Sequence, residues 1–267
     1  MKKSDKVWTI IIAVVIVLLV GVTVYSGVWP PVSVVESSSM QHSSQWTTDG
    51  IYTGDIVFVK KVTSPSSQIV TYLNGSSTGY STYGEYGSVI LYTATDGNTI
   101  IHRAMFYLTW NENTPVVAGY TNQSWVTVTQ NYVRLDNVGY SHRNLVVEIG
   151  GMVGESGYIT AGDYNLGSAP KSEFNSALNG YVVADQNVGI TSGPVKDSQV
   201  KGVAFGEIPW FGLIKLNFLR AYGEWPYYND VPQNSYLFLW ISIAAIIAAV
   251  GIPVTYLDIK KRRGRKR

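Results

Sequence analysis

The segment Thr99–Leu108 reads TIIHRAMFYL, and it sets the expected fold of the chain. It is rich in β-branched and aromatic residues, which favour extended strands, and it shows no helical spacing of apolar residues. Asp96-Gly97 separates it from a second apolar run, Ser88–Thr93, which reads SVILYT. Asp-Gly between two such runs is a strong signal for a tight hairpin turn. The sequence therefore predicts an antiparallel pair of strands at this point.

Similar short apolar runs recur on both sides of this pair, between stretches rich in Gly, Ser, Asn and Asp. They are Asp55–Val62, Pro115–Tyr120, Trp125–Thr129, Leu145–Ile149 and Val200–Phe205. We therefore expect residues 26–235 to form a mainly β domain, long enough to bury one substantial core. Two stretches interrupt the pattern, near residues 63–87 and 164–184, and we interpret both as surface insertions.

An apolar run without any charged residue stands at each end of the β region. The first is Trp8–Tyr25 and the second is Leu237–Tyr256. Each approaches the ~20 residues that a helix needs to cross the hydrocarbon core of a bilayer. We therefore expect transmembrane helices at residues 7–25 and 236–256. A cleavable signal peptide is the alternative for the first run, although no A-x-A-like site follows it, and a buried core helix is the alternative for the second.

The formal net charge of +2 conceals a sorting of charge along the chain. Three of the first six residues and seven of the last eight are basic, whereas residues 26–235 carry ten basic and sixteen acidic residues. The positive-inside rule then predicts cytoplasmic ends at residues 1–6 and 257–267, with residues 26–235 on the outer face of the cell membrane. Because each basic end adjoins an apolar run, contact with lipid headgroups is favoured over binding to nucleic acid.

Composition restricts the chemistry that the β region can perform. The chain has no Cys, which excludes a thiol nucleophile and a Cys-built zinc site, and it has only three His. His42 and His142 lie in polar contexts typical of surface loops. His102 lies within the apolar run Thr99–Leu108, where a buried imidazole needs a polar partner. The segment Glu36–Met40 (ESSSM) offers a hydroxyl nucleophile. A Ser-rich turn and a structural His are the simpler alternatives for these features.

The order of motifs resembles that of type I signal peptidases, in the archaeal and endoplasmic-reticulum branch that carries His in place of a general-base Lys. The resemblance extends over residues 8–215. The matching motifs are ESSSM (36–40), TGDIVFVKK (53–61), IIHRAMF (100–106), AGDYN (161–165), VADQ (183–186), GPVK (193–196), QVKG (199–202) and IPWFG (208–212).

The resemblance implies a signal-peptidase-like β catalytic domain with a Ser–His–Asp type of site. Ser39 matches the nucleophile and His102 the general base, while Ser37 matches a residue that helps the backbone N–H of Ser39 to form the oxyanion hole. Asp163 matches the first acid of the family, and Asp185 matches the second, displaced by an insertion. Either acid would orient His102 and stabilise its imidazolium form. The chain departs from the family pattern at position 42, where His replaces the usual Pro.

The function implied by the resemblance is that of a membrane-bound serine endopeptidase that removes N-terminal signal peptides from exported preproteins, without a metal or other cofactor. Its expected partners are preproteins that carry signal peptides, the lipid bilayer and the protein translocation machinery, and not nucleic acid. Two alternatives stay open. One is a Ser–Lys dyad that uses Lys60 or Lys61. The other is a non-catalytic, anchored surface β domain for adhesion or scaffolding, which would have no reason to keep this order of motifs.

Overall fold

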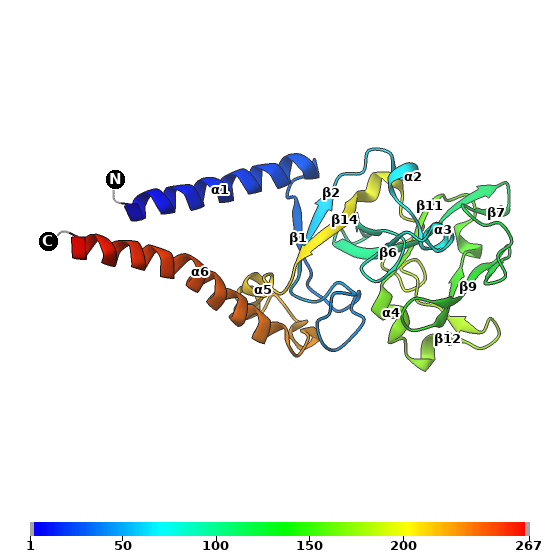
Figure 1. The fold of residues 1–267 in the computed structure, drawn as a ribbon. Helices are drawn as coiled ribbons and strands as arrows, with labels where there is room; N and C mark the ends of the chain where they lie inside the picture. The colour runs from blue at the N-terminus through cyan, green and yellow to red at the C-terminus, as the bar shows by residue number, and fades with distance from the viewer. Residues whose placement is uncertain (1–2, 265–267) are drawn as a thin grey trace.

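Two long helices extend from one end of a β-rich domain and lie alongside each other (Figure 1). The computed structural model describes residues 3–264, with side chains for residues 7–251. Helix α1 (Lys3–Ser26) precedes the domain, and helix α6 (Ser235–Gly264) follows it. The basic ends predicted to be cytoplasmic, residues 1–6 and 257–267, fall outside the described side chains.

Helix α1 is long and apolar enough to cross a membrane over Val7–Ser26, and its apolar window is not buried against the domain, although Ser26 at the end of the helix is buried. Helix α6 includes the second predicted span, but its apolar part within the described residues, Ser235–Gly251, is shorter than a full crossing. The remainder of that predicted span, up to residue 256, lies outside the described side chains. The second crossing therefore stays a prediction.

The larger sheet has seven strands in the order β1-β2-β14-β5-β6-β11, with β7 paired to β6. All of these pairs are antiparallel, and β1 lies at an edge of the sheet. The hairpin predicted at Asp96-Gly97 is confirmed, because Thr93 of β5 lies opposite Thr99 of β6. The strands are β1 (Val32–Val34), β2 (Ile56–Lys60), β5 (Val89–Thr93), β6 (Thr99–Asn111), β7 (Thr114–Val117), β11 (Gly157–Ala161) and β14 (Val200–Ile208).

The smaller sheet has five strands in the order β12-β13-β10-β9-β8. The pair β10–β13 is parallel and the other pairs are antiparallel. Its strands are β8 (Val126–Val128), β9 (Tyr132–Val138), β10 (Arg143–Glu148), β12 (Phe174–Asn175) and β13 (Gly180–Tyr181).

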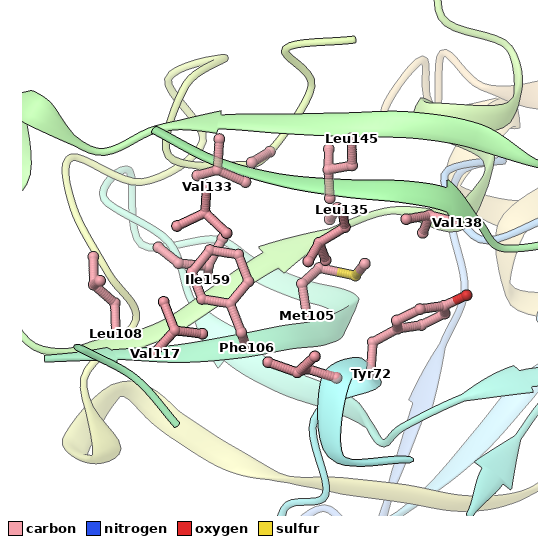
Figure 2. Packing of buried hydrophobic residues seen from close by; sticks show 14 of the residues in the cluster. Tyr72, Met105, Phe106, Leu108, Val117, Val133, Leu135, Val138, Leu145 and Ile159 are labelled. Carbon is pink, nitrogen blue, oxygen red and sulfur yellow. The ribbon is translucent and has the colours of Figure 1, made fainter. Parts of the chain in front are cut away.

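The main core forms where the two sheets face each other. Phe106 from β6 and Ile159 from β11 meet Leu135 from β9 and Leu145 from β10, and all four side chains are fully buried (Figure 2). Burying a side chain of this size contributes ~1.5–3 kcal/mol relative to leaving it exposed. This core fixes the long strand β6, which also carries His102, four residues before Phe106 and opposite Ile90 of β5.

The two predicted insertions, near residues 63–87 and 164–184, contribute to the core and to the smaller sheet. Residues 63–87 form helices α2 (Pro65–Gln68) and α3 (Tyr72–Thr78) and the hairpin of β3 (Ser81–Thr82) with β4 (Glu85–Tyr86). Leu73 of α3 is fully buried in the main core. Residues 164–184 supply β12 and β13, which complete the smaller sheet. The interpretation as surface insertions is therefore wrong for the parts that are buried or paired in the sheet. The sequence does not indicate these parts, because elements this short show no periodicity of apolar residues.

The remaining short elements connect the sheets to one another and to α6. Helix α5 (Leu213–Ala221) follows β14. Its Leu213 and Leu216 are buried against Trp225, from the segment after α5, and against Leu239 of α6. The others are α4 (Asp163–Gly167) and four 3-10 turns, η1 (Gly150–Met152), η2 (Lys171–Glu173), η3 (Asp197–Gln199) and η4 (Tyr228–Asp230).

Candidate active site

Ser39 lies on an irregular loop that follows the edge strand β1. Its neighbour Met40 is almost completely buried, in a cluster with Ile51 and Val57, and so pins the loop to the larger sheet. The carbonyl oxygen of Ser39 accepts a hydrogen bond of 2.9 Å from the backbone N–H of Tyr164. Ser39 itself is partly exposed. The loop is therefore fixed at its backbone while the Ser39 side chain stays accessible.

His102 is buried and paired with Asp185. Its Nδ1 lies 2.8 Å from both carboxylate oxygens of Asp185, and the His102 side chain is only 4% exposed. The hydroxyl of Tyr92 donates a 2.6 Å hydrogen bond to Oδ2 of Asp185, and the Asp185 backbone N–H is bound by the carbonyl of Thr160 in β11. Two strands and one following loop thus hold the imidazole in a single orientation, with Nε2 facing away from the carboxylate.

The charge of Asp185 is stabilised by these contacts. Burial acts to raise the pKa of this carboxyl, but the neighbouring imidazole and the hydrogen bonds hold the pKa below its usual range. Burial and then the negative charge of Asp185 raise the pKa of Tyr92, which keeps the phenol protonated as a donor. A carboxylate fixed in this way can stabilise a positively charged imidazolium on His102.

Gly162 brings the Ser39 loop and His102 together. A Cβ atom placed on Gly162 would lie 2.5 Å from the carbonyl oxygen of Ser39 and 2.9 Å from Nε2 of His102. Only a residue without a side chain fits between them, and the Ser39 backbone and His102 Nε2 are therefore close neighbours. Within the part of the chain that the structure describes, Ser39 Oγ makes no hydrogen bond to His102. Such bonds in ligand-free sites often close only when the substrate is bound.

Asp163 does not contact His102 and has different partners. Arg103 binds both of its carboxylate oxygens, through Nε at 2.8 Å and Nη2 at 2.6 Å, and Nε2 of His42 lies 3.0 Å from Oδ2. Burial acts to raise the pKa of Asp163, but the Arg103 guanidinium lowers it to about 2. Of the two acids left open by the sequence, Asp185 is therefore the one placed to orient His102.

His42 is not the free surface residue that the sequence predicted. Its side chain is 9% exposed, it binds Asp163, and its ring stacks on Tyr140 with 4.4 Å between centroids. His42 thus belongs to a buried cluster with Asp163 and Arg103. The polar neighbours of His42 in the sequence gave no signal of this cluster.

A groove with a volume of about 800 Å³ opens over the site. Ser37, Ser39 and His102 all line it, and so does Asn165, which no pattern in the sequence marks as a site residue. The other lining residues come mainly from the segments Val32–Met40 and Asn98–His102, together with Pro30, Ile190, Lys215, Tyr227 and Asp230. The groove therefore runs from the edge strand β1 to the start of β6.

Lys60 lies outside this groove. Its ammonium group is 3.2 Å from the hydroxyl of Tyr25 and 4.5 Å from the centre of that ring, at the base of helix α1. Neither Lys60 nor Lys61 is among the groove residues. Among the described residues, no three His, Asp or Glu side chains lie close enough together to hold a metal ion.

The arrangement can activate a hydroxyl. A serine on a pinned loop, an imidazole whose Nε2 has no hydrogen-bond partner among the described residues and a buried carboxylate bound to the other ring nitrogen are the parts that nucleophilic catalysis by serine requires. Comparison of the chain with protein-family models, with curated proteins and with solved structures finds no match.

Proposed function

We propose that the chain is a membrane-anchored serine endopeptidase that removes N-terminal signal peptides from exported preproteins. The observation that carries this proposal is the buried His102–Asp185 pair, whose free Nε2 adjoins the Ser39 backbone across Gly162. A binding domain without catalysis has no need of a desolvated His–Asp pair beside an accessible serine in an open groove.

The proposed reaction is acyl transfer through Ser39. His102 Nε2 takes the proton of the Ser39 hydroxyl as Oγ attacks the scissile carbonyl carbon, and Asp185 stabilises the imidazolium that results. His102 then returns the proton to the leaving amine. Water, activated by the same imidazole, hydrolyses the acyl-enzyme and restores Ser39. We assign the backbone N–H of Ser39 and the hydroxyl of Ser37 to the oxyanion, since both residues line the groove.

The proposed substrate is an extended peptide. Strand β1 has β2 on one side only among the described strands, and its residues Val32–Val34 line the groove. An extended chain can pair with such an edge and so present its scissile bond to Ser39. The small residues at −3 and −1 of a signal-peptide cleavage site suit this mode, because they let the substrate backbone approach closely.

The proposed location is the outer face of the cell membrane. Support comes from the apolar span of α1, which ends at Ser26, shortly before the site, and from the basic residues at both ends of the chain. We propose that α6 crosses the bilayer as well, so that both termini are cytoplasmic. A site tethered in this way would meet preproteins as they leave the translocation machinery, while their apolar helices are still in the bilayer.

The test is cleavage of a preprotein by the purified full-length protein, with Ser39→Ala and His102→Ala beside the wild type. We expect both variants to lose activity by about 10³-fold or more, since each removes a member of a catalytic unit. Lys60→Ala and Lys61→Ala serve as controls and should keep full activity. Undiminished cleavage by Ser39→Ala would rule out the assigned nucleophile.

Two other outcomes would redirect the assignment. Loss of activity in Lys60→Ala or Lys61→Ala, with His102→Ala active, would favour the Ser–Lys dyad. A wild-type protein that binds preproteins or cell-surface material without cleaving any peptide would favour the non-catalytic surface domain.

A further inference from the structure

The segment between α5 and α6 lies against the loop that carries Ser39. We call residues 222–234 the brace and residues 36–46 the nucleophile loop. At one end of the brace, Trp225 Nε1 donates a 2.8 Å hydrogen bond to the carbonyl of Glu36, and the Trp225 side chain is 2% exposed. At the other end, the Asn234 side chain and the Trp46 backbone exchange two hydrogen bonds of 2.7 and 3.1 Å.

Asp230, in the middle of the brace, makes the contacts closest to the nucleophile. Its Oδ2 accepts a 3.0 Å hydrogen bond from the hydroxyl of Ser38, the residue before Ser39. Its carbonyl accepts a 2.8 Å hydrogen bond from Nε2 of Gln41, whose side chain is buried and also donates to the hydroxyl of Thr53. Asp230 itself lines the groove. Asp230 therefore holds the loop at Ser38 and at Gln41, on either side of Ser39, and makes no hydrogen bond to Ser39 itself.

The nucleophile loop needs external support of this kind. It contains no helix or strand, so no ladder of backbone hydrogen bonds fixes its course. Its own backbone bond from Gln41 N–H to the Ser38 carbonyl closes one tight turn around Ser39. The Tyr164 N–H holds the turn from the side of His102, and Asp230 holds it from the side of the brace. A hydrogen bond to a carboxylate is roughly twice as strong as one between neutral groups.

We infer that Asp230 is a positioning residue for Ser39, and that the brace makes the geometry of the site depend on the C-terminal helix. The inference rests on the proposed function, because it assigns the Ser38–Asp230 contact to the placement of the catalytic hydroxyl. The brace ends at Asn234 and α6 begins at Ser235, so the element that holds the nucleophile loop continues directly into the helix.

A small displacement of Ser39 is enough to matter. A nucleophile must lie within hydrogen-bond reach of its base and in line with the scissile carbonyl, and a misplacement of ~1 Å can reduce the rate by about 10²-fold. Loss of the Asp230 carboxylate frees Ser38 and loosens the turn, but it leaves the His102–Asp185 pair and the edge of β1 unchanged. The expected defect is therefore in kcat, with KM preserved.

The test compares Asp230→Ala, Ser38→Ala and the double variant, all as full-length proteins, with a peptide that contains a signal-peptide cleavage site. We expect each single variant to lower kcat by about 10-fold with KM within about 2-fold of the wild type. The double variant should be no worse than either single variant, because both remove the same hydrogen bond. Asp230→Asn keeps an oxygen acceptor for Ser38 and should recover part of kcat.

Two controls separate positioning from a general effect. Asp197→Ala removes an exposed carboxylate that does not line the groove and should leave kcat unchanged. Hydrogen–deuterium exchange should show faster exchange of residues 36–46 in Asp230→Ala and unchanged exchange in the core strands β6 and β11. Wild-type kcat in Asp230→Ala and Ser38→Ala, or losses that add up in the double variant, would overturn the inference and leave the proposed function intact. A wild-type protein that cleaves nothing would remove both.

Discussion

At the scale of single residues, the site depends on two buried carboxylates that do different work. The Asp185 carboxylate binds His102, Tyr92 and Thr160, none of which carries a permanent charge, and it can therefore stabilise a positive charge that forms on the imidazole. Asp163 is neutralised permanently by Arg103, whose side chain is 1% exposed. The guanidinium also donates to the carbonyl oxygens of residues 82 and 85–87, so this ion pair ties the β3–β4 hairpin to the AGDYN segment.

The two acids should therefore respond differently to the same substitution. Asp185→Asn leaves the shape of the site intact but removes the charge that stabilises the imidazolium, and we expect kcat to fall by about 10³–10⁴-fold with little change in Tm. Asp163→Asn leaves the Arg103 charge buried without a partner, and we expect a loss of ~3–5 kcal/mol in the free energy of unfolding. Peptide cleavage and thermal unfolding of the two purified variants measure both effects. A stable Asp163→Asn variant with no activity, beside an active Asp185→Asn, would reverse the roles.

At the scale of elements, the sequence predicts the strands that carry a clear pattern. Strands β2, β5, β6, β10 and β14 fall within or close to their expected ranges, because β-branched and aromatic residues dominate them. Strand β11 was missed: its sequence, GYITA, is buried on both faces and does not alternate. Strands β1, β12 and β13 have two or three residues, which is too few for any periodicity to be read.

The site residues that could be predicted are those marked by their neighbours in the sequence, whereas those that depend on contacts between distant segments could not be predicted. His102 could be predicted because one imidazole in an apolar strand is a local anomaly. The choice between Asp185 and Asp163 could not, since it depends on which loop reaches β6 in space. Asp230 gave no signal at all: it is an ordinary polar residue in a connecting segment, and its partner Ser38 is 192 residues away in the chain.

Strand β14 carries a carboxyl group that should make the stability of the domain depend on pH. Oε2 of Glu207 is buried and has no hydrogen-bond partner among the described residues. Burial, and then the charge of Asp55, raise the pKa of Glu207 to about 8, while burial raises the pKa of Asp55 to about 6. The folded state thus binds these protons more tightly than the unfolded state. The contribution of these two carboxyl groups to the free energy of unfolding is fully present below the ordinary pKa values of Glu and Asp. It is lost as the pH rises towards about 8, the pKa of Glu207 in the folded state.

We therefore expect the Tm of the wild-type protein to fall between pH 5 and pH 9, and Glu207→Gln to remove much of this fall. The variant should melt about 3–6 °C above the wild type at pH 9 and close to it at pH 5. Glu224→Gln, at an exposed acidic residue before Trp225, is the matched control and should follow the wild type. Parallel curves for wild type and Glu207→Gln would show that Glu207 is not protonated in the folded state.

At the scale of the whole molecule, the important relation is between the site and the two helices. Helices α1 and α6 leave the same end of the β domain (Figure 1), and the nucleophile loop is connected to both. It follows α1 by a short segment that includes β1, and the brace ties it to the start of α6. If these helices lie in the bilayer, the groove is held at a fixed distance from the lipid surface.

If the chain is the signal-peptide-removing protease proposed above, a fixed distance predicts a strong preference for substrates that share its membrane. A preprotein whose apolar helix is in the same vesicle is confined near the groove, and such confinement raises the effective substrate concentration to about the millimolar range. With enzyme and preprotein reconstituted together, we expect cleavage at least about 100-fold faster than that of a soluble peptide with the same cleavage sequence at micromolar concentration. Enzyme and preprotein in separate vesicles provide the control, because the groove and sequence are then unchanged but confinement is lost. Equal rates for shared and separate vesicles would mean that the helices anchor the protein without selecting its substrates.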